Sequence, residues 1–184
     1  MEYFSHRRDS LHKIVEDYTA LAEVVKGFKA IRHKVVVTVG SWDLLHIGHV
    51  RYLNRAKEQG DLLIVGVDTD RAVRLYKGEL RPVVPYEERC EMLTYQSCVD
   101  LVTPVDDLNE KGEWQYGLVE ATKPDVFVAV EDSYPQHQLD EIKKHCGKVV
   151  VLPRQAERTS TTHLIQHAVK KHLDHLYTLL EKER

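Results

Sequence analysis

The chain has 184 residues, of which 42% are hydrophobic, and its formal net charge is −3 at pH 7. This length predicts one domain with short additions, and the small charge gives no general reason to expect nucleic-acid binding. The three cysteines are odd in number and form no Cys-x-x-Cys pair, so we expect neither a disulfide framework nor a zinc site. The N-terminus lacks a signal-peptide core, and no apolar run approaches the ~20 residues that span a bilayer, which predicts a cytoplasmic protein without a membrane partner.

Apolar runs alternate with amphipathic segments along the chain. The runs predict strands at Val35–Val39, Asp61–Asp68, Val99–Val105, Asp125–Val130 and Lys148–Leu152. Helical patterns lie at Ser10–Phe28, Gly48–Gly60, Pro85–Ser97, Trp114–Thr122, Pro135–His145 and Ser160–Glu181. A strand, a helix and a strand in succession imply parallel pairing with a right-handed crossover. We therefore predict an α/β fold, a Rossmann-like doubly wound parallel sheet of about five strands with helices on both faces.

Two of these helices are additions to the sheet. The N-terminal helix, capped by Asp9 or Ser10, is expected to pack on its own domain, and packing on a partner subunit is the alternative. The long C-terminal helix either packs back on the domain or forms a dimer interface. Its apolar stripe consists of Ile165, Ala168, Val169, Leu173, Leu176 and Leu180. We divide the chain into an N-terminal helical extension (residues 1–33), a main domain (34–160) and this helix (161–184).

The most informative stretch is residues 35–49, in which a β-branched strand leads through a turn to a helix with two histidines at its start. Gly40 permits the sharp turn, and Gly48 lets a phosphate approach the main chain. The unpaired N–H groups and the positive dipole end of the helix favour an anion. His46 and His49 are three residues apart, which places both imidazoles on one side of the first turn.

Residues 40–49 resemble the Gly-x-aromatic-Asp-x-x-His-x-Gly-His signature of the cytidylyltransferase-like nucleotidyltransferases. The similarity extends from about Lys34 to Leu164, with Trp42 in place of the more usual phenylalanine. The family includes glycerol-3-phosphate cytidylyltransferase and the heptose-phosphate adenylyltransferases. Class I aminoacyl-tRNA synthetases share His-x-Gly-His, but this chain is too short for one and has no Lys-Met-Ser-Lys-Ser-like loop.

The basic loop at residues 77–82 resembles the Lys-Gly-x-x-Arg-Pro segment of the heptose-phosphate adenylyltransferase branch. The resemblance implies that Lys77 and Arg81 contact phosphate, Lys77 as a mobile point charge and Arg81 as a bidentate group. It favours a sugar phosphate as acceptor and ATP as donor, while the wider family keeps CTP open. Glycerol phosphate is disfavoured, because the lysine that such enzymes place after their mid-chain tryptophan is missing near Trp114.

Two further loops follow strands at the same expected sheet edge. Family members commonly carry Arg-Thr-x-Gly-Ile-Ser-Thr before the last helix, where this chain offers both Arg154 and Arg158 and then Ser160 and Thr161. The alignment leaves open which arginine binds phosphate, and Ser160 is equally suited to be a helix cap. After the fourth strand stand Glu131 and Asp132, where the family reads part of the nucleotide; because this loop departs from the family pattern, the base is left open.

The resemblance thus implies a nucleotidyltransferase (EC 2.7.7 type), in which an acceptor phosphate attacks the α-phosphorus of a nucleoside triphosphate and pyrophosphate leaves. The implied catalytic residues are His46, His49, Lys77, Arg154 and Arg158. The implied nucleotide-binding residues are Gly40, Ser41, Trp42, Gly48, Glu131, Asp132, Ser160 and Thr161. Mg²⁺ is expected to bridge the phosphates, with Asp43 as the nearest carboxylate, and a homodimer is expected. The alternative is a non-catalytic nucleotide-binding regulatory module.

Overall fold

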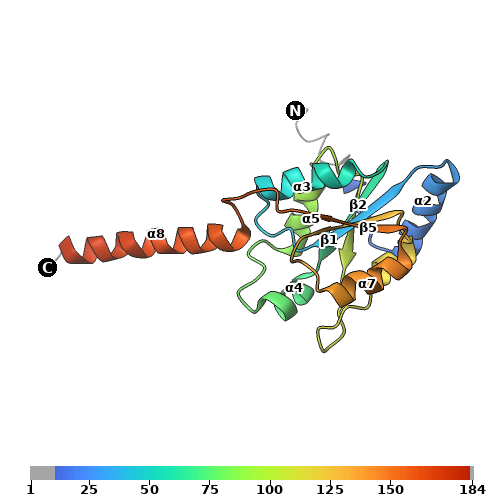
Figure 1. Ribbon diagram of the computed structural model, residues 1–184. Coiled ribbons are helices and arrows are strands. Elements are labelled where there is room, and N and C mark those ends of the chain that lie inside the picture. The colour runs from blue at the N-terminus through green and yellow to red at the C-terminus, as the bar shows by residue number, and fades with distance from the viewer. Residues whose placement is uncertain (1–10, 183–184) are drawn as a thin grey trace.

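The computed structural model describes residues 11–182 and contains a five-stranded parallel sheet in the order β3-β2-β1-β4-β5 (Figure 1). The strands are β1 (Val35–Gly40), β2 (Leu62–Asp68), β3 (Leu101–Val105), β4 (Val126–Val130) and β5 (Lys148–Leu152). The helices are α2 (Tyr18–Ala30), α3 (Ile47–Lys57), α4 (Asp70–Lys77), α5 (Tyr86–Thr94), α6 (Gly117–Thr122), α7 (Gln136–His145) and α8 (Thr161–Lys182). The predicted α/β architecture is confirmed.

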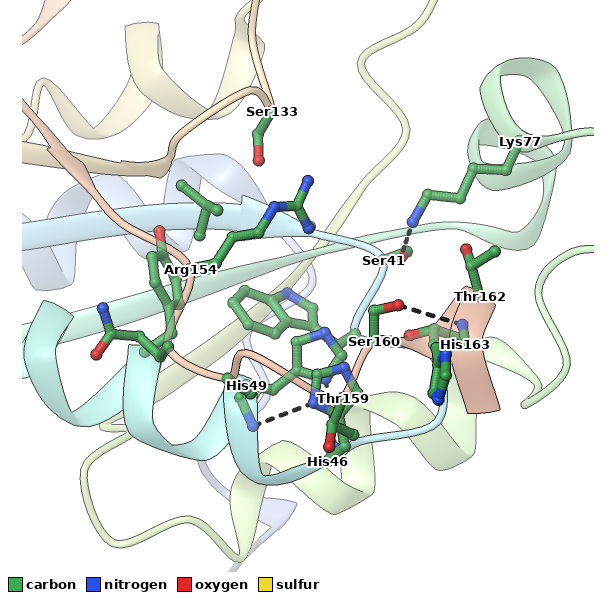
Figure 2. A pocket seen from close by; sticks show the side chains of 18 of the residues that line it. Ser41, His46, His49, Lys77, Ser133, Arg154, Thr159, Ser160, Thr162 and His163 are labelled. Carbon is green, nitrogen blue, oxygen red and sulfur yellow. Dashed lines mark hydrogen bonds between the residues drawn. The ribbon is translucent and has the colours of Figure 1, made fainter. Parts of the chain in front are cut away.

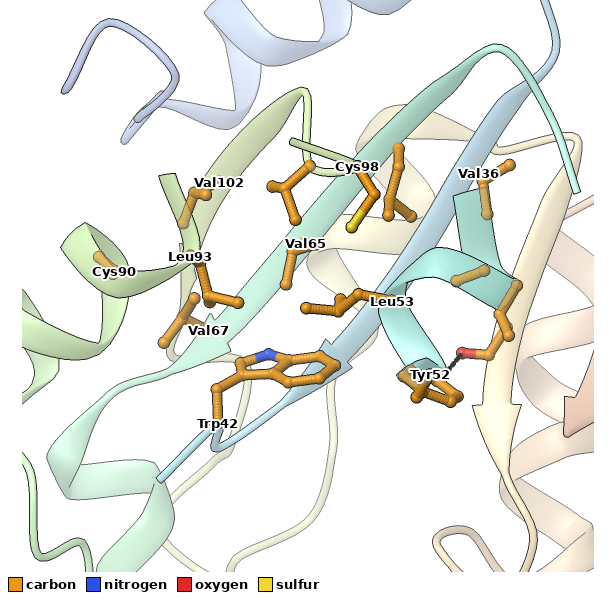
Figure 3. Close-up of a cluster of buried hydrophobic side chains, with 14 of the residues drawn as sticks. Val36, Trp42, Tyr52, Leu53, Val65, Val67, Cys90, Leu93, Cys98 and Val102 are labelled. Atoms are coloured by element: carbon orange, nitrogen blue, oxygen red, sulfur yellow. Dashed lines mark hydrogen bonds between the residues drawn. The ribbon is translucent and has the colours of Figure 1, made fainter. Parts of the chain in front are cut away.

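Alternate residues of the central strand face two separate hydrophobic clusters. Val36 belongs to a cluster that includes Leu53 of α3 and Leu93 of α5, which Figure 3 shows. Val35 and Val37 pack on the opposite face with residues of α2, α6 and α7. Because successive strand side chains point to opposite faces, a β1 buried on both sides reads as a continuous β-branched run.

The chain adds β2 and β3 on one side of β1 and then crosses to the other side to form β4 and β5. The strand order therefore reverses between β1 and β4. In open parallel sheets, ligands bind outside the carboxyl ends of the strands at such a reversal. This topology directs attention to the loops that follow β1, β2 and β4.

The predicted start of the N-terminal helix is wrong. The helix α2 begins at Tyr18, because the Asp17 carboxylate accepts hydrogen bonds from Thr19 N at 2.9 Å and Ala20 N at 3.3 Å. The segment before it runs beside the edge strand β3, where Val15 N donates to Val102 O at 2.8 Å. This pairing provides hydrogen-bond partners for backbone N–H and C=O groups that an edge strand would otherwise leave unpaired. The predicted caps Asp9 and Ser10 lie outside the described residues.

The prediction also missed one helix and placed the start of another too early. The helix α4 was not expected; Thr69 caps it by accepting a hydrogen bond from Ala72 N at 3.2 Å. The helix α6 begins at Gly117 rather than at Trp114, which instead forms an antiparallel bridge with Leu108.

The two additional helices behave differently. Leu21 and Val25 of α2 are buried in the main core, so this helix packs on its own domain. In contrast, α8 projects away from the domain (Figure 1), and Leu173 and Leu176 on it are 49% and 54% exposed. The division of the chain at residues 33 and 160 stays a prediction. Within residues 11–182, no helix is both long and apolar enough to cross a membrane.

Candidate active site

A cavity of about 840 Å³ opens at the carboxyl ends of β1 and β4 (Figure 2). The predicted site residues that line it are Gly40, Ser41, Trp42, His46, Gly48, His49, Lys77, Arg81, Arg154, Arg158, Ser160 and Thr161. Three predicted residues, Asp43, Glu131 and Asp132, are not among its lining residues. Segments far apart in the sequence thus meet at the edge where the strand order reverses.

The two histidines form a stacked pair at the start of α3, with ring centroids 3.9 Å apart. His46 Nδ1 accepts a hydrogen bond from Gly48 N at 3.1 Å, and His49 Nδ1 accepts one from His46 N at 3.4 Å. Because each Nδ1 is an acceptor, the proton of each neutral ring resides on Nε2. The backbone therefore fixes both rings as Nε2–H donors.

The protein environment keeps both imidazoles neutral. Burial lowers the pKa of His46, and burial together with His46 and Lys77 lowers the pKa of His49 to about 3. Desolvation disfavours the charged imidazolium of His49, and the Lys77 ammonium disfavours it further. The pair therefore presents two uncharged hydrogen-bond donors.

Gly48 is required because residue Ala156 approaches this turn closely. A Cβ on Gly48 would lie 2.9 Å from His46 Cε1 and 3.1 Å from Ala156 Cβ. The absence of a side chain at Gly48 thus leaves its backbone accessible to a phosphate, while the turn packs closely against Ala156.

Trp42 is 5% exposed and belongs to the buried cluster drawn in Figure 3. Its indole N–H donates to Gly66 O at 2.8 Å, and its ring meets that of His49 edge-on at 5.6 Å. Tyr52, which sequence reasoning missed, packs against the same indole and donates to Val128 O at 2.9 Å. Its only signal in the sequence is that it follows His49 by three residues on the helix.

Lys77, the last residue of α4, reaches across the cavity to Ser41. Its Nζ donates to Ser41 Oγ at 2.7 Å, and Figure 2 shows this contact opposite the histidines. Burial lowers the pKa of Lys77, and Arg81 nearby lowers it further. A cation held in this way favours an anionic partner.

Asp43 has a different environment from the one expected of a metal ligand. Its carboxylate is fully buried and accepts hydrogen bonds from Arg81 Nε at 2.7 Å and from Val83 N and Val84 N at 3.1 Å and 3.0 Å. Burial raises the pKa of Asp43, but these donors outweigh it and hold the pKa below the ordinary value. We therefore correct the expectation of a metal ligand: Asp43 ties the β1–α3 turn to the loop that follows α4.

Arg81 lines the cavity while its Nε is committed to Asp43. Its Nη2 is buried and has no hydrogen-bond partner among the described residues. One donor of this predicted phosphate ligand is therefore unpaired beside the cavity.

The segment of residues 153–161, here called the strap, forms the opposite wall. Arg154 N donates to Glu131 Oε1 at 2.9 Å, so Glu131 anchors the strap rather than lining the cavity. Figure 2 shows the Arg154 side chain extending toward Ser133. Arg154 and Arg158 both line the cavity, so the choice between them stays open. Ser160 Oγ accepts a hydrogen bond from His163 N at 3.2 Å, which is the cap interaction anticipated for it.

Arg89 of α5 is a second residue that sequence reasoning missed. Its side chain is 1% exposed, and its Nη2 donates to Asp70 Oδ1 at 2.7 Å. Its Nε donates to Val84 O at 3.0 Å, and its Nη1 donates to Ser41 O. One buried guanidinium thus holds three loops of the site in register.

A doubly wound parallel sheet with neutral donors at a helix start, and with Lys77, Arg81, Arg154 and Arg158 lining the cavity, is typical of α/β proteins that bind phosphate. The sequence profile of the cytidylyltransferase-like family matches residues 37–174. The chain therefore belongs to the cytidylyltransferase-like family, as predicted from residues 40–49.

Two curated relatives are both described as "Bifunctional protein HldE". The one from Geobacter metallireducens is 34% identical over 158 residues, which cover 85% of this chain and 31% of that protein. The one from Hydrogenovibrio crunogenus is 41% identical over 133 residues, 72% of this chain and 25% of that protein. The chain spans a third or less of the length of these relatives. A crystal structure of a lipopolysaccharide core biosynthesis protein from Thermoplasma volcanium superimposes with a TM-score of 0.56 and 26% identity, covering 67% of this chain and 99% of that one.

Proposed function

We propose that this protein transfers a nucleoside monophosphate from a nucleoside triphosphate to a phosphorylated small molecule. A phosphate oxygen of the acceptor attacks the α-phosphorus, and the bond to the leaving pyrophosphate breaks. The observation that carries this proposal is the stacked histidine pair at the start of α3, in which both Nδ1 atoms accept backbone hydrogen bonds and neither Nε2 has a backbone partner within residues 11–182, with Lys77 across the cavity.

The acceptor is already an anion, so the reaction needs no covalent nucleophile from the protein. The protein has to position two polyanions and to stabilise the negative charge that develops between them. His46 and His49 donate to the triphosphate through Nε2–H, and the backbone N–H groups of α3 add further donors. Lys77 and one of Arg154 and Arg158 offset the charge on the phosphates.

Magnesium is proposed to arrive with the nucleotide. Among residues 11–182 there is no group of three or more His, Cys, Asp or Glu residues that could hold a metal ion. Asp43 is already bonded to Arg81, and Asp70 is already bonded to Arg89. The residues present therefore do not form a protein metal site, and we propose an ion held by phosphate oxygens and water.

We propose ATP as donor and a sugar phosphate as acceptor. The support is the resemblance of residues 77–82 to the heptose-phosphate adenylyltransferase segment, together with the similarity to the HldE proteins. The test is release of pyrophosphate from ATP and CTP with hexose and heptose 1-phosphates, glycerol 3-phosphate and phosphoethanolamine. We expect turnover with ATP and a sugar phosphate. Nucleotide binding without pyrophosphate from any acceptor would instead favour the regulatory module, and wild-type turnover by His46→Ala would contradict the mechanism.

A cytoplasmic location is proposed because the thiols of Cys90 and Cys98 are free and buried.

We also propose that α8 pairs with α8 of a second copy. Val169, Leu173, Leu176 and Leu180 follow the four-three-four spacing of a two-helix seam and are each about half exposed or more. A free helix of this kind gains most of its stability by packing its apolar face. Sedimentation analysis should show a dimer that Leu173→Glu with Leu176→Glu converts to a monomer, whereas Lys171→Glu on the opposite face leaves it intact. A wild-type monomer at micromolar concentration would contradict this proposal.

A further inference from the structure

A second cavity of about 480 Å³ adjoins the first. Both are lined by Ser41, Lys77, Ser133 and Tyr134. The second cavity also has walls of its own, from Asp68 at the end of β2, Tyr76 on α4, Trp114 and Gln138. Two ligands can therefore lie side by side, with Lys77 and Ser41 between them.

Lys77 is the group that both ligands would share. Its Nζ donates to Ser41 Oγ at 2.7 Å and lies 5.4 Å from the centre of the Tyr76 ring. A molecule in the second cavity can place an anionic end at this ammonium group, next to a triphosphate in the first cavity. The rest of that molecule then faces Asp68, Tyr76 and Trp114.

The polar centre of the second cavity is a carboxylate held by a phenol. Asp68 is 5% exposed, and Tyr76 Oη donates to its Oδ2 at 2.5 Å. No other side-chain hydrogen bond to this carboxylate is found among the described residues. Burial raises the pKa of Asp68 to about 6, while Tyr76, Lys77 and Arg89 act in the opposite direction.

These groups are acceptors suited to hydroxyl donors. Carboxylate and phenol oxygens accept hydrogen bonds from sugar hydroxyls, and an indole face packs against the apolar face of a sugar ring. Resting on the nucleotidyl transfer proposed above, we propose that the second cavity binds the ring of a sugar phosphate acceptor, with Asp68 and Tyr76 recognising its hydroxyl groups.

The same walls discriminate against ammonium-bearing acceptors. An aromatic cavity with a carboxylate would otherwise attract a cation. Here the lining includes the carboxylates of Asp68 and Asp132 and the Lys77 ammonium, which opposes the charge of Asp68 and repels a second cation in the cavity. A polyhydroxylated, uncharged ring meets no such repulsion.

Calorimetric titration tests this inference without requiring turnover. The protein is saturated with a non-hydrolysable ATP analogue and titrated with glucose, mannose and heptose 1-phosphates, glycerol 3-phosphate and phosphoethanolamine. We expect a sugar phosphate to bind most tightly. Tyr76→Phe and Asp68→Asn should each weaken its binding about tenfold, as loss of one hydrogen bond to a ligand does. The affinity for the ATP analogue should change less than about twofold.

Tyr95→Phe is the matched control, because its hydroxyl also bonds to a carboxylate, that of Glu91 at 2.8 Å, but lies outside both cavities. The inference is overturned if no sugar phosphate binds, if both variants bind it as the wild type does, or if phosphoethanolamine binds more tightly. If sugar phosphate binds as expected but no pyrophosphate is released, the proposed reaction fails while this ligand assignment stands.

Discussion

The two walls of the cavity are built in different ways. The β1–α3 wall (residues 40–49) is fixed from below by the Trp42 indole, the buried Asp43 carboxylate and the Arg89 guanidinium. The strap is mostly exposed or half-buried and is held to the domain by hydrogen bonds to Glu131 and to the Asp43 carbonyl. A rigid wall can present donors in a preorganised geometry, whereas a weakly held wall can adapt to a ligand. Changes in the first should therefore lower the rate, and changes in the second should lower affinity.

The largest expected effect comes from the rigid wall. His49→Ala removes a fixed Nε2–H donor, and we expect kcat to fall about 10²–10³-fold, as for loss of one preorganised donor to developing charge. Pyrophosphate release under saturating substrates measures the effect. His172→Ala, on the projecting helix, should retain wild-type kcat. Equal kcat values for both variants would show that the pair isn't part of the reaction.

The next largest effect is expected from the buried Arg89 guanidinium. Arg89→Met leaves the partners of the guanidinium unpaired, and we expect the free energy of unfolding to fall by about 3 kcal/mol. Arg55→Met removes a pair with Glu58 in which both side chains are more than half exposed, and it should cost less than about 1 kcal/mol. Urea denaturation of both variants measures the contrast. A similar small loss for both would mean that Arg89 does not hold the wall.

The neutral histidine predicts a pH effect on stability. The folded-state pKa of His49 is about 3, below its unfolded value of 6.5, so the unfolded chain binds more protons between these values. Stability contributed by the neutral ring is therefore present above pH 6.5 and is lost as the pH falls. Linkage gives a loss of about 2 kcal/mol between pH 7 and pH 5. The free energy of unfolding of His49→Asn should fall less over this range, and an identical slope would contradict the assignment.

The smallest effects are expected from the strap. Replacement of the phosphate-binding arginine by alanine should raise the KM for nucleotide about tenfold and change kcat less, because an exposed arginine contributes mainly to binding. Comparison of Arg154→Ala with Arg158→Ala identifies that arginine. If alanine in place of that arginine lowered kcat and left KM unchanged, the strap would act like the β1–α3 wall instead.

The strands could be predicted from the sequence because each is an apolar run with a clear end. The predicted bounds of β4 and β5 lie within one residue of those observed. The start of α2 could not be predicted in the same way. Leu11 and Ile14 fit a helical period, yet this segment instead pairs with β3, and only the Asp17 cap marks the start of the helix. Tertiary pairing overrides local periodicity there.

The histidine turn was predictable because its parts are neighbours in the sequence. Tyr52 and Tyr134, which line the cavity, and Arg89, which bonds to the Ser41 carbonyl, were not, because only the fold creates these contacts. Asp43 illustrates the same limit. Its position beside the signature favours a metal ligand, but the loop after α4 covers it with donors from residues some forty positions away in the chain.

The helix α8 begins at the lip of the cavity, where Thr161 Oγ1 donates to Asp43 O at 2.8 Å. Its 22 residues form a rod roughly 33 Å long at 1.5 Å per residue. A rigid helix that is held at Thr161 moves as one body, so a partner bound at its C-terminal end would also orient the residues at the edge of the cavity. A partner bound along α8 would therefore act on the β1–α3 turn through the contact between Thr161 and the Asp43 carbonyl.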